Sequence, residues 1–356
     1  MEQQTKPPIR IVIADDSPLI LKVLGDIFSD RPDIELVGRA RDGEEAFRMV
    51  TELRPDLLCT DFHMPHMDGL QLIEKLMAEH PLPIIVVSVS VLKEENDQNI
   101  FRLLAAGALD VFPKPRGGFN RNSPEALALI DKVKLMSRVK VVRRHHRQPQ
   151  RPPNQTMVIP PIADVKRGSA VIAIGASTGG PGALLQILST LPPQFPLPIL
   201  VVQHVGEGFL DSLVRWLNDN SALRVVIARN GQSPELGTVY FPAEQHHLGL
   251  NHFGHLYLSQ DPPVNGIYRP SVDYLFRAVA MAAGRHSMGI LLTGMGRDGA
   301  EGLLQLKNSG AETVAQDEKS SVIYGMPMEA VKLGAVRSQL PLTKIAGHMV
   351  NFARNI

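Results

Sequence analysis

Residues 171–182 read VIAIGASTGGPG, an apolar run that leads directly into a glycine-rich turn. The apolar run is typical of a buried strand, and GALLQILSTL after it has the apolar spacing of a helix. A strand, a tight turn and a helix in this order predict an α/β domain with a parallel sheet. Such a turn either cradles the phosphate of a nucleotide or carries a nucleophile, here Ser177.

The nucleotide interpretation fails on spacing. The dinucleotide pattern GxGxxG needs a glycine where Ser177 stands, and the pattern GxxxGxG needs one where Pro181 stands. None of the five tyrosines has a lysine four residues later, as the short-chain dehydrogenases do. A dehydrogenase that binds a nicotinamide cofactor therefore fits the chain poorly.

Two residues further along support the nucleophile interpretation. His204 ends the apolar run VVQH, and Asp298 follows another run in LLTGMGRDG. The carboxyl ends of parallel strands meet at one edge of a sheet, so these residues can supply Ser177 with a general base and an orienting carboxylate. Free N–H groups at the start of the next helix can hold the oxyanion. Spacing alone leaves open that Ser177 is a helix cap, His204 a hydrogen-bonded strand end and Asp298 a turn residue.

Composition limits the class of protein. A chain of 356 residues with 44% apolar residues is long enough for two domains. Its formal charge is only +1, so no global field attracts nucleic acid or an acidic membrane surface. The sequence has one cysteine, no signal-peptide core at its start and no apolar run of roughly 20 residues. We therefore expect a cytoplasmic protein that neither binds nucleic acid nor inserts into a membrane.

A basic, proline-rich segment at residues 143–168 has no sustained apolar periodicity, which predicts a linker. Residues 1–142 before it alternate strand-like and helix-like runs, and residues 169–356 after it do the same. Both patterns predict doubly wound α/β domains, whose functional groups gather at the carboxyl ends of the strands.

Charged residues follow the predicted strands of the first domain. Asp15 and Asp16 follow the first strand, Asp61 the third and Lys114 the fifth, while Ser88 ends the fourth. Converging carboxylates repel one another unless a hard cation such as Mg²⁺ binds between them. One carboxylate can then attack a phosphoryl group while the metal and the lysine offset its charge. A single acidic residue could cap a helix instead, but the joint pattern favours a phosphoryl acceptor.

The motifs ADDS, TDFHMPHMDG, VVSVS and KP resemble the receiver domain of two-component response regulators, over about residues 9–142. The resemblance implies a flavodoxin-like fold. It implies that Asp61 accepts the phosphoryl group and that Asp15, Asp16 and Asp61 bind the metal.

The same resemblance implies a switch role for the Ser88 hydroxyl and a phosphoryl contact for Lys114. Val111 stands where many receivers carry a switching aromatic residue, so the usual aromatic-flip account of signalling does not transfer directly to this chain.

The motifs IGASTGGP, VVQH, RPSVDYLF, LLTGMGRDGAEGL, AQDEKSSVIYGMP and LGAV resemble the catalytic domain of CheB-type protein-glutamate methylesterases, over roughly residues 169–350. A receiver joined by a linker to this domain is also that family's architecture. The resemblance implies the following roles: Ser177 as nucleophile, His204 as base, Asp298 as orienter, and Thr178 and the backbone near Met295 as oxyanion support.

The family's activity is hydrolysis of glutamate γ-methyl esters on chemoreceptors, with release of methanol, and deamidation of particular receptor glutamines. The resemblance implies methylated chemoreceptors as substrates and a chemotaxis histidine kinase as phosphodonor. It implies no cofactor for hydrolysis and Mg²⁺ for phosphorylation. A catalytically silent adaptor is the alternative, against which the retained triad residues argue.

Two segments depart from the family pattern. Val205 and Gly206 stand where relatives commonly have Met-Pro after the histidine, and PAEQHH at 242–247 replaces the usual Ala-Pro-Gly-Asp-Arg-His. Both lie beside the proposed triad, so we expect them to affect substrate choice more than chemistry.

Three further features have structural interpretations. The histidines at 246, 247, 252 and 255 match no familiar zinc spacing, and we expect them to face solvent or to be hydrogen-bonded. Cys59 and Trp216 lie in apolar runs and are expected in the cores.

Overall fold

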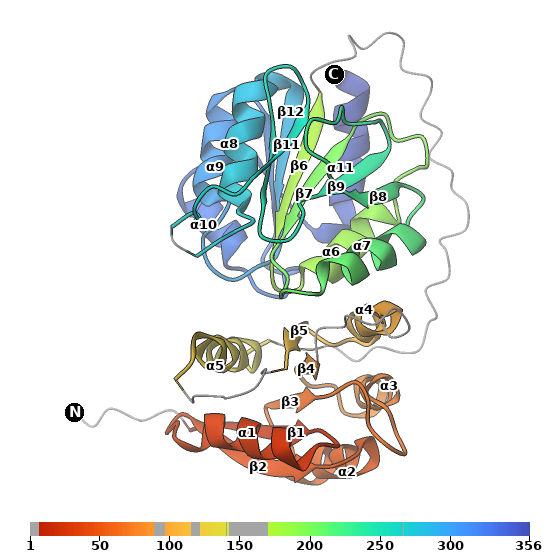
Figure 1. The fold of residues 1–356 in the computed structure, drawn as a ribbon, viewed down its shortest axis with the longest axis vertical. Coiled ribbons are helices and arrows are strands. Elements are labelled where there is room, and N and C mark those ends of the chain that lie inside the picture. Colours follow the sequence, from red (N-terminus) through yellow and green to blue (C-terminus); the bar gives the residue numbers. More distant parts are fainter. Residues whose placement is uncertain (1–6, 89–96, 115–121, 140, 142–169, 266) are drawn as a thin grey trace, which may run out of the picture. The chain divides into compact units, whose positions relative to one another are not determined.

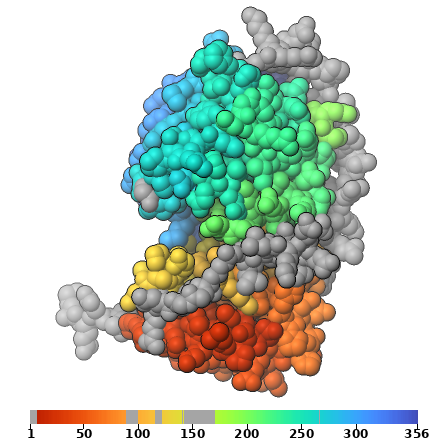
Figure 2. All heavy atoms as spheres, in the orientation of Figure 1, coloured from red at the N-terminus to blue at the C-terminus, as the bar shows by residue number. Residues whose placement is uncertain are grey.

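The structure is a computed structural model that describes the chain except for residues 1–6, 89–96, 115–121, 140, 142–169 and 266 (Figure 1). Contacts within the chain divide it into two compact units, Met1–Pro152 and Pro153–Ile356. This division falls in the predicted linker 143–168, which lies outside the described residues, so the exact domain boundaries stay a prediction. In the space-filling view each unit is a closely packed body in its own range of colours (Figure 2).

The first unit is a five-stranded parallel sheet in the order β2-β1-β3-β4-β5. Its strands are β1 (Ile9–Ala14), β2 (Ile34–Ala40), β3 (Leu57–Thr60), β4 (Ile84–Ser88) and β5 (Asp110–Pro113). Its helices are α1 (Pro18–Ser29), α2 (Gly43–Leu53), α3 (Gly69–Glu79), α4 (Asp97–Ala106) and α5 (Pro124–Met136). Helices α1 and α5 pack together on one face, and α2, α3 and α4 on the other (Figure 1). The predicted alternation of strand and helix is confirmed.

Side-chain caps explain where two of these helices begin. Ser17 caps α1 by accepting the backbone N–H of Ile20, and Asp68 forms a capping box at the start of α3. Neither Asp15 nor Asp16 is the cap of α1, so both carboxylates are left for another role.

The second unit is a seven-stranded sheet in the order β14-β13-β12-β6-β7-β9-β8, with every neighbouring pair parallel. Its strands are β6 (Val171–Ala176), β7 (Ile199–Gln203), β8 (Arg224–Ile227), β9 (Thr238–Phe241), β12 (Ser287–Leu291), β13 (Glu312–Gln316) and β14 (Ser338–Leu340). The first strand of this sheet is β6. Strands β7, β8 and β9 lie on one side of it, and β12, β13 and β14 lie on the other. Ligands of such sheets bind at the carboxyl ends near the point where the strand order reverses.

Helices cover both faces of the second sheet. The helices are α6 (Gly180–Leu188), α7 (Leu210–Asp219), α8 (Val272–Ala282), α9 (Ala300–Asn308), α10 (Met326–Lys332) and α11 (Leu342–Asn355), with a 3₁₀ turn, η1 (Gly284–His286). Helices α8, α9 and α10 lie on one face, and α6, α7 and α11 on the other (Figure 1). The predicted doubly wound fold is confirmed.

The sequence analysis did not assign every element of this unit. It missed the hairpin of β10 (His247–Leu250) and β11 (Leu256–Ser259), and it missed β14. One of its motifs overlaps the end of β13 and the start of α10, but it assigned no strand or helix there. It also assigned no element to α11. Strands of three or four residues are too short for a clear alternation of apolar and polar residues, which explains the first omission.

Cys59 and Trp216 lie in the cores, as expected. Cys59 is 1% exposed, and burial raises the pKa of its thiol to about 12, which leaves it protonated and unreactive at neutral pH. Trp216 is 4% exposed and belongs to the buried side of α7. Across the described ranges, no helix combines the length and apolar character needed to cross a bilayer.

Candidate functional site

Ser177, His204 and Asp298 follow three neighbouring strands of the second sheet. Ser177 directly follows β6, His204 directly follows β7, and Asp298 lies in the loop between β12 and α9. The N–H of Ser177 donates to the carbonyl of Thr293 at 3.0 Å, and that of His204 donates to the carbonyl of Ala176 at 3.0 Å. Backbone hydrogen bonds therefore continue beyond the sheet and fix the three strand ends against one another.

The imidazole of His204 is held by Asp298. Its Nε2 lies 2.9 Å from Oδ2 of Asp298, whose side chain is fully buried. Burial alone would raise the pKa of Asp298, but hydrogen bonds from His204 and from the backbone of Val272 and Asp273 outweigh it, so this pKa is lowered. With Asp298 ionised, Nε2 of neutral His204 carries the proton and Nδ1 keeps the lone pair.

The start of α8 supplies Asp298 with its other donors. Oδ1 accepts from the hydroxyl of Ser271 at 2.8 Å and from the N–H of Asp273 at 3.1 Å. Oδ2 accepts from the N–H of Val272 at 2.7 Å. The first N–H groups of a helix have no partner within it, and they lie at the positive end of its dipole. A simple turn residue would not need four donors, so the structure favours an orienting role for Asp298.

The side chain of Ser177 does not cap a helix. The N-cap of α6 is Gly179, which makes no side-chain cap and has φ 77°, a conformation that favours glycine. A Cβ at Gly294 would lie 2.7 Å from the Cβ of Ser177, so this close approach also requires glycine. In the described part of the chain, no hydrogen bond joins the Ser177 hydroxyl to His204. Such contacts are often long without substrate and tighten on binding.

Gln203 links the loops of the serine and the histidine. It is 3% exposed, and its Nε2 donates to the carbonyls of both Ser177 and His204, each at 2.8 Å. The side chain packs against Gly180, where a Cβ would lie 1.9 Å from Oε1 of Gln203. Gln203 therefore holds the two strand ends at a fixed separation.

Thr178 and Met295 provide backbone donors beside Ser177. The carbonyl of Thr178 accepts from the hydroxyl of Thr293 at 2.9 Å, and Met295 follows Gly294, which lies against Ser177. Neither Thr178 nor Met295 has an acceptor for its backbone N–H among the residues that the structure describes. Both N–H groups are thus available to a developing oxyanion.

The predicted charged residues of the first unit also come together. Asp15, Asp16 and Asp61 each offer a carboxylate oxygen within 4.8 Å of the others. Nζ of Lys114 lies 2.5 Å from Oδ2 of Asp61 and 2.7 Å from Oδ2 of Asp15. Ser88 is 2% exposed, and its carbonyl accepts the N–H of Lys114 at 2.5 Å.

Burial and charge oppose each other in this acidic pocket. Burial raises the pKa of Asp15, and the hydrogen bond from Lys114 offsets this only in part. Burial would lower the pKa of Lys114, but Asp61 and Asp15 outweigh it, so this pKa is raised and the lysine stays charged. Three hard carboxylate oxygens close together, with Asp16 exposed to solvent, suit Mg²⁺.

The histidines near the hairpin do not gather into a metal site. Over the described residues, the acidic pocket is the single group of three or more His, Cys, Asp or Glu side chains close enough to hold an ion. His247 is 0% exposed; its Nδ1 accepts the N–H of Ser271 at 3.2 Å, and its ring stacks on Tyr274. Burial lowers its pKa, so it is a neutral structural residue, in keeping with the hydrogen-bonded alternative.

Comparisons with known proteins cover both units of the chain. Residues 172–349 match the family profile described as CheB methylesterase, and residues 11–119 match that of the response regulator receiver domain. A protein of Nitrosospira multiformis named protein-glutamate methylesterase/protein-glutamine glutaminase is 43% identical over 344 residues, which cover 96% of each chain. The chain belongs to the CheB methylesterase family. A similarly named protein of Syntrophus aciditrophicus is 42% identical, over 98% of this chain and 99% of that one.

A crystal structure from the same family supports the fold of the second unit. The CheB methylesterase catalytic domain of Thermotoga maritima is 35% identical and matches with a TM-score of 0.50. The match covers 98% of that chain and 51% of this one.

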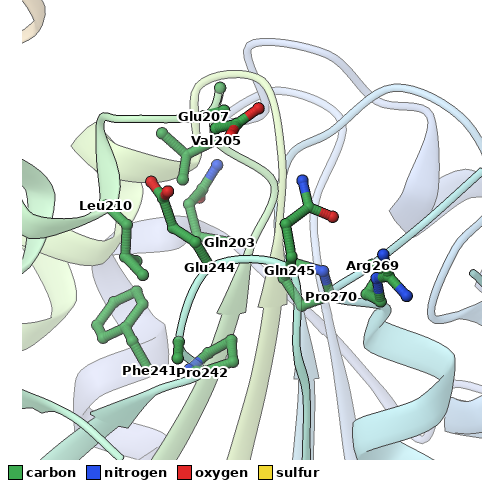
Figure 3. A pocket seen from close by; sticks show the side chains of 12 residues that line it. Gln203, Val205, Glu207, Leu210, Phe241, Pro242, Glu244, Gln245, Arg269 and Pro270 are labelled. Atoms are coloured by element: carbon green, nitrogen blue, oxygen red, sulfur yellow. The ribbon is translucent and has the colours of Figure 1, made fainter. Parts of the chain in front are cut away.

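The two departures from the family pattern meet at one pocket beside His204. The pocket measures about 50 Å³. Figure 3 shows Val205 and Glu207 above Glu244, Gln245 and Pro242. Glu244 in the second departure accepts the N–H of Gly208, just after the first, at 2.7 Å. A hydrogen bond therefore joins the two segments.

Sequence reasoning missed two residues that touch the site. Gln203 stands within the motif VVQH, beside the predicted base, and that position was its only signal. Tyr268 entered the sequence analysis only as one of the tyrosines that lack a lysine four residues later, yet its ring stacks on that of His204. No local spacing could reveal this stack, because the two residues are far apart in the chain.

Gln203→Glu tests the link between the two loops. The change keeps the size of the side chain but turns its paired donor into a carboxylate oxygen that faces two carbonyls. We expect the free energy of unfolding to fall by about 1–3 kcal/mol, the usual cost of leaving buried polar groups unpaired. Urea denaturation measures the change, with exposed Gln186→Glu in α6 as the control. Equal stability of the two variants would contradict the link.

Asp273→Asn tests the electrostatics behind Asp298. Asp273 is 2% exposed and accepts the N–H of Gly302 at 2.6 Å; burial raises its pKa from 3.8 to about 6. The folded state thus binds this proton more tightly than the unfolded chain, and the stability that it contributes below about pH 4 is lost as the pH rises through 6. Asn keeps an acceptor without the charge.

At pH 7 we expect the free energy of unfolding of Asp273→Asn to exceed that of the parent by on the order of 1–3 kcal/mol. The difference should shrink towards pH 4. Denaturant titrations between pH 4 and pH 7 measure it, and a difference that does not vary with pH would be inconsistent with a raised pKa.

Proposed function

We propose that this chain hydrolyses glutamate γ-methyl esters on chemoreceptors and releases methanol, as a cytoplasmic enzyme of chemosensory adaptation. The observation that carries the proposal is the hydrogen bond between His204 and the buried carboxylate of Asp298, at the edge of the sheet where Ser177 also lies. Similarity to proteins named protein-glutamate methylesterase/protein-glutamine glutaminase, over nearly the whole chain, supplies the substrate class.

The first half of the reaction forms an acyl-enzyme. The Ser177 hydroxyl attacks the side-chain carbonyl carbon of the esterified glutamate, and its proton passes to Nδ1 of His204, because Nε2 is engaged by Asp298. The carbonyl oxygen becomes an oxyanion, to which the N–H groups of Thr178 and Met295 donate. The bond to the methoxy group then breaks, and the proton on Nδ1 leaves with it as methanol.

The second half repeats this pattern with water. His204 takes a proton from the water, which attacks the acyl carbon, and the bond to Ser177 breaks as the hydroxyl regains its proton. A receptor glutamine would follow the same path with ammonia as the first product. The same site therefore accounts for deamidation as well as for ester hydrolysis.

Phosphorylation of Asp61 by a chemotaxis histidine kinase is the proposed control of this activity. Asp15, Asp16 and Asp61 would hold Mg²⁺, which offsets charge on the transferring phosphoryl oxygens. Lys114 already lies against Asp61 and would contact the phosphoryl group, and the nearby hydroxyl of Ser88 would respond to it.

Val111 limits how the receiver can signal. It lies half-buried in β5 and pairs with Val86, while its neighbour Phe112 is an 8% exposed core residue. No aromatic side chain therefore stands at the usual switching position, so Ser88 and Lys114 carry the proposed response. We propose residues 1–142 as the receiver and residues 169–356 as the catalytic domain, joined by the linker.

Ser177→Ala and His204→Ala each remove one member of a unit that acts jointly. We expect each variant to lose on the order of 10⁴- to 10⁶-fold in turnover, and Asp298→Asn to lose a similar or smaller amount. Methanol release from methylated receptors measures activity, and circular dichroism checks the fold. Substantial turnover by Ser177→Ala would remove the serine mechanism. A parent protein that binds receptors but releases no methanol would be an adaptor instead.

Phosphorylation and metal should affect regulation but not the chemistry of hydrolysis. We expect a phosphodonor to stimulate the full chain about 5- to 150-fold, as a coupling of about 1–3 kcal/mol would allow. Asp61→Ala or a chelator should abolish the stimulation and leave basal methanol release unchanged. The control Asp131→Ala, at an exposed position of α5, should keep both the stimulation and the basal release. If a chelator stops basal hydrolysis and zinc restores it, the reaction depends on a metal and this account is wrong.

A further inference from the structure

The imidazole of His204 contacts an aromatic side chain as well as the carboxylate of Asp298. The ring of Tyr268 lies on the imidazole with 4.7 Å between centroids and 10° between planes. Asp298 contacts one edge atom of the imidazole, which leaves the plane of the ring free to tilt about that bond. A parallel ring against the face restricts this tilt. Together the two contacts define both the edge and the plane of His204.

Tyr268 is itself held in place. The backbone of Tyr268 exchanges hydrogen bonds with Val264, at 3.0 Å and 3.2 Å. A Cβ at Gly296 would lie 2.9 Å from the hydroxyl oxygen of Tyr268, so the phenol end reaches the loop that carries Met295. The ring is thus fixed between the histidine and the proposed oxyanion loop.

We propose that Tyr268 is a positioning residue that keeps the imidazole of His204 in the plane required for proton transfer from Ser177 and to the leaving group. This inference rests on the function proposed above. During the reaction His204 becomes a cation, and the face of an aromatic ring attracts a cation at this range. Tyr268 therefore favours the protonated intermediate as well as the correct orientation of the neutral base.

The hydroxyl of Tyr268 has no part in this role. Burial, followed by the charge of Asp298, raises the pKa of Tyr268, so it remains a neutral phenol and does not serve as a base. The stacked ring should therefore be sufficient, and phenylalanine should replace it.

A second stack in the same unit shows how a structural pair differs. His247 stacks on Tyr274 with 4.3 Å between ring centroids, but His247 is 0% exposed and its ring contacts backbone groups of Ser271 and Pro262. His204 instead has a carboxylate at one nitrogen and is 16% exposed in its side chain. Of these two stacks, the one with Tyr268 therefore involves the ring that can exchange a proton with a substrate.

The test compares four variants of the full chain: Tyr268→Phe, Tyr268→Leu, Tyr268→Met and Ile267→Ala. Phe keeps the ring, Leu and Met remove it, and Ile267 is a 71% exposed neighbour on the same turn that serves as control. Methanol release from methylated receptors gives kcat and KM for each variant, and thermal unfolding identifies any variant that does not fold. Met provides a second variant without a ring if Leu unfolds.

We expect Tyr268→Phe and Ile267→Ala to retain kcat within about twofold of the parent, and the variants without a ring to lose about 5- to 30-fold in kcat with KM nearly unchanged. A purely structural role would lower the melting temperature without this separation of kcat from KM. Full kcat in a folded Leu or Met variant would overturn the inference, as would a change confined to KM or a Phe variant as impaired as Leu. A parent that releases no methanol would overturn the proposed function itself.

Discussion

The buried carboxylate of Asp298 is the constraint on which the second unit depends. An isolated charge in a protein interior is costly, and it is tolerated only where donors replace the water that it has lost. Here four donors do so: His204, the Ser271 hydroxyl and the first two N–H groups of α8. The same contacts fix the start of α8, the loop after β12 and the edge of His204. The carboxylate therefore organises the fold locally and orients the base.

Close packing around the serine completes what Asp298 begins. Gly294 and Gly180 leave no room for a side chain, so the loop after β12 and the start of α6 approach Ser177 and Gln203 directly. Gln203 then joins the serine and histidine loops through their carbonyls. These contacts leave the N–H groups beside Ser177 unpaired within the described chain, which is the condition for oxyanion stabilisation.

The sequence predicted both folds and the strand ends that carry charged or nucleophilic groups. Continuous apolar runs identify buried parallel strands, and the geometry of such sheets brings residues such as Ser177 and His204 to one edge. Tyr268 and the hairpin of β10 and β11 escaped prediction because their positions are set by tertiary contacts of short, irregular segments. The bond between Glu244 and Gly208 likewise joins two departures that the sequence could only place separately.

The two units use their strand ends in different electrostatic ways. Around Asp298 the negative charge is matched by fixed dipoles, so the arrangement is rigid and suited to repeated proton transfer. Around Asp61 it is matched by the side-chain cation of Lys114, which is shared with Asp15. A phosphoryl group on Asp61 would compete for that lysine, whose backbone N–H is bonded to the carbonyl of Ser88. The ends of β4 and β5 are thus directly linked to the charge on Asp61, which makes the first unit responsive where the second is preorganised.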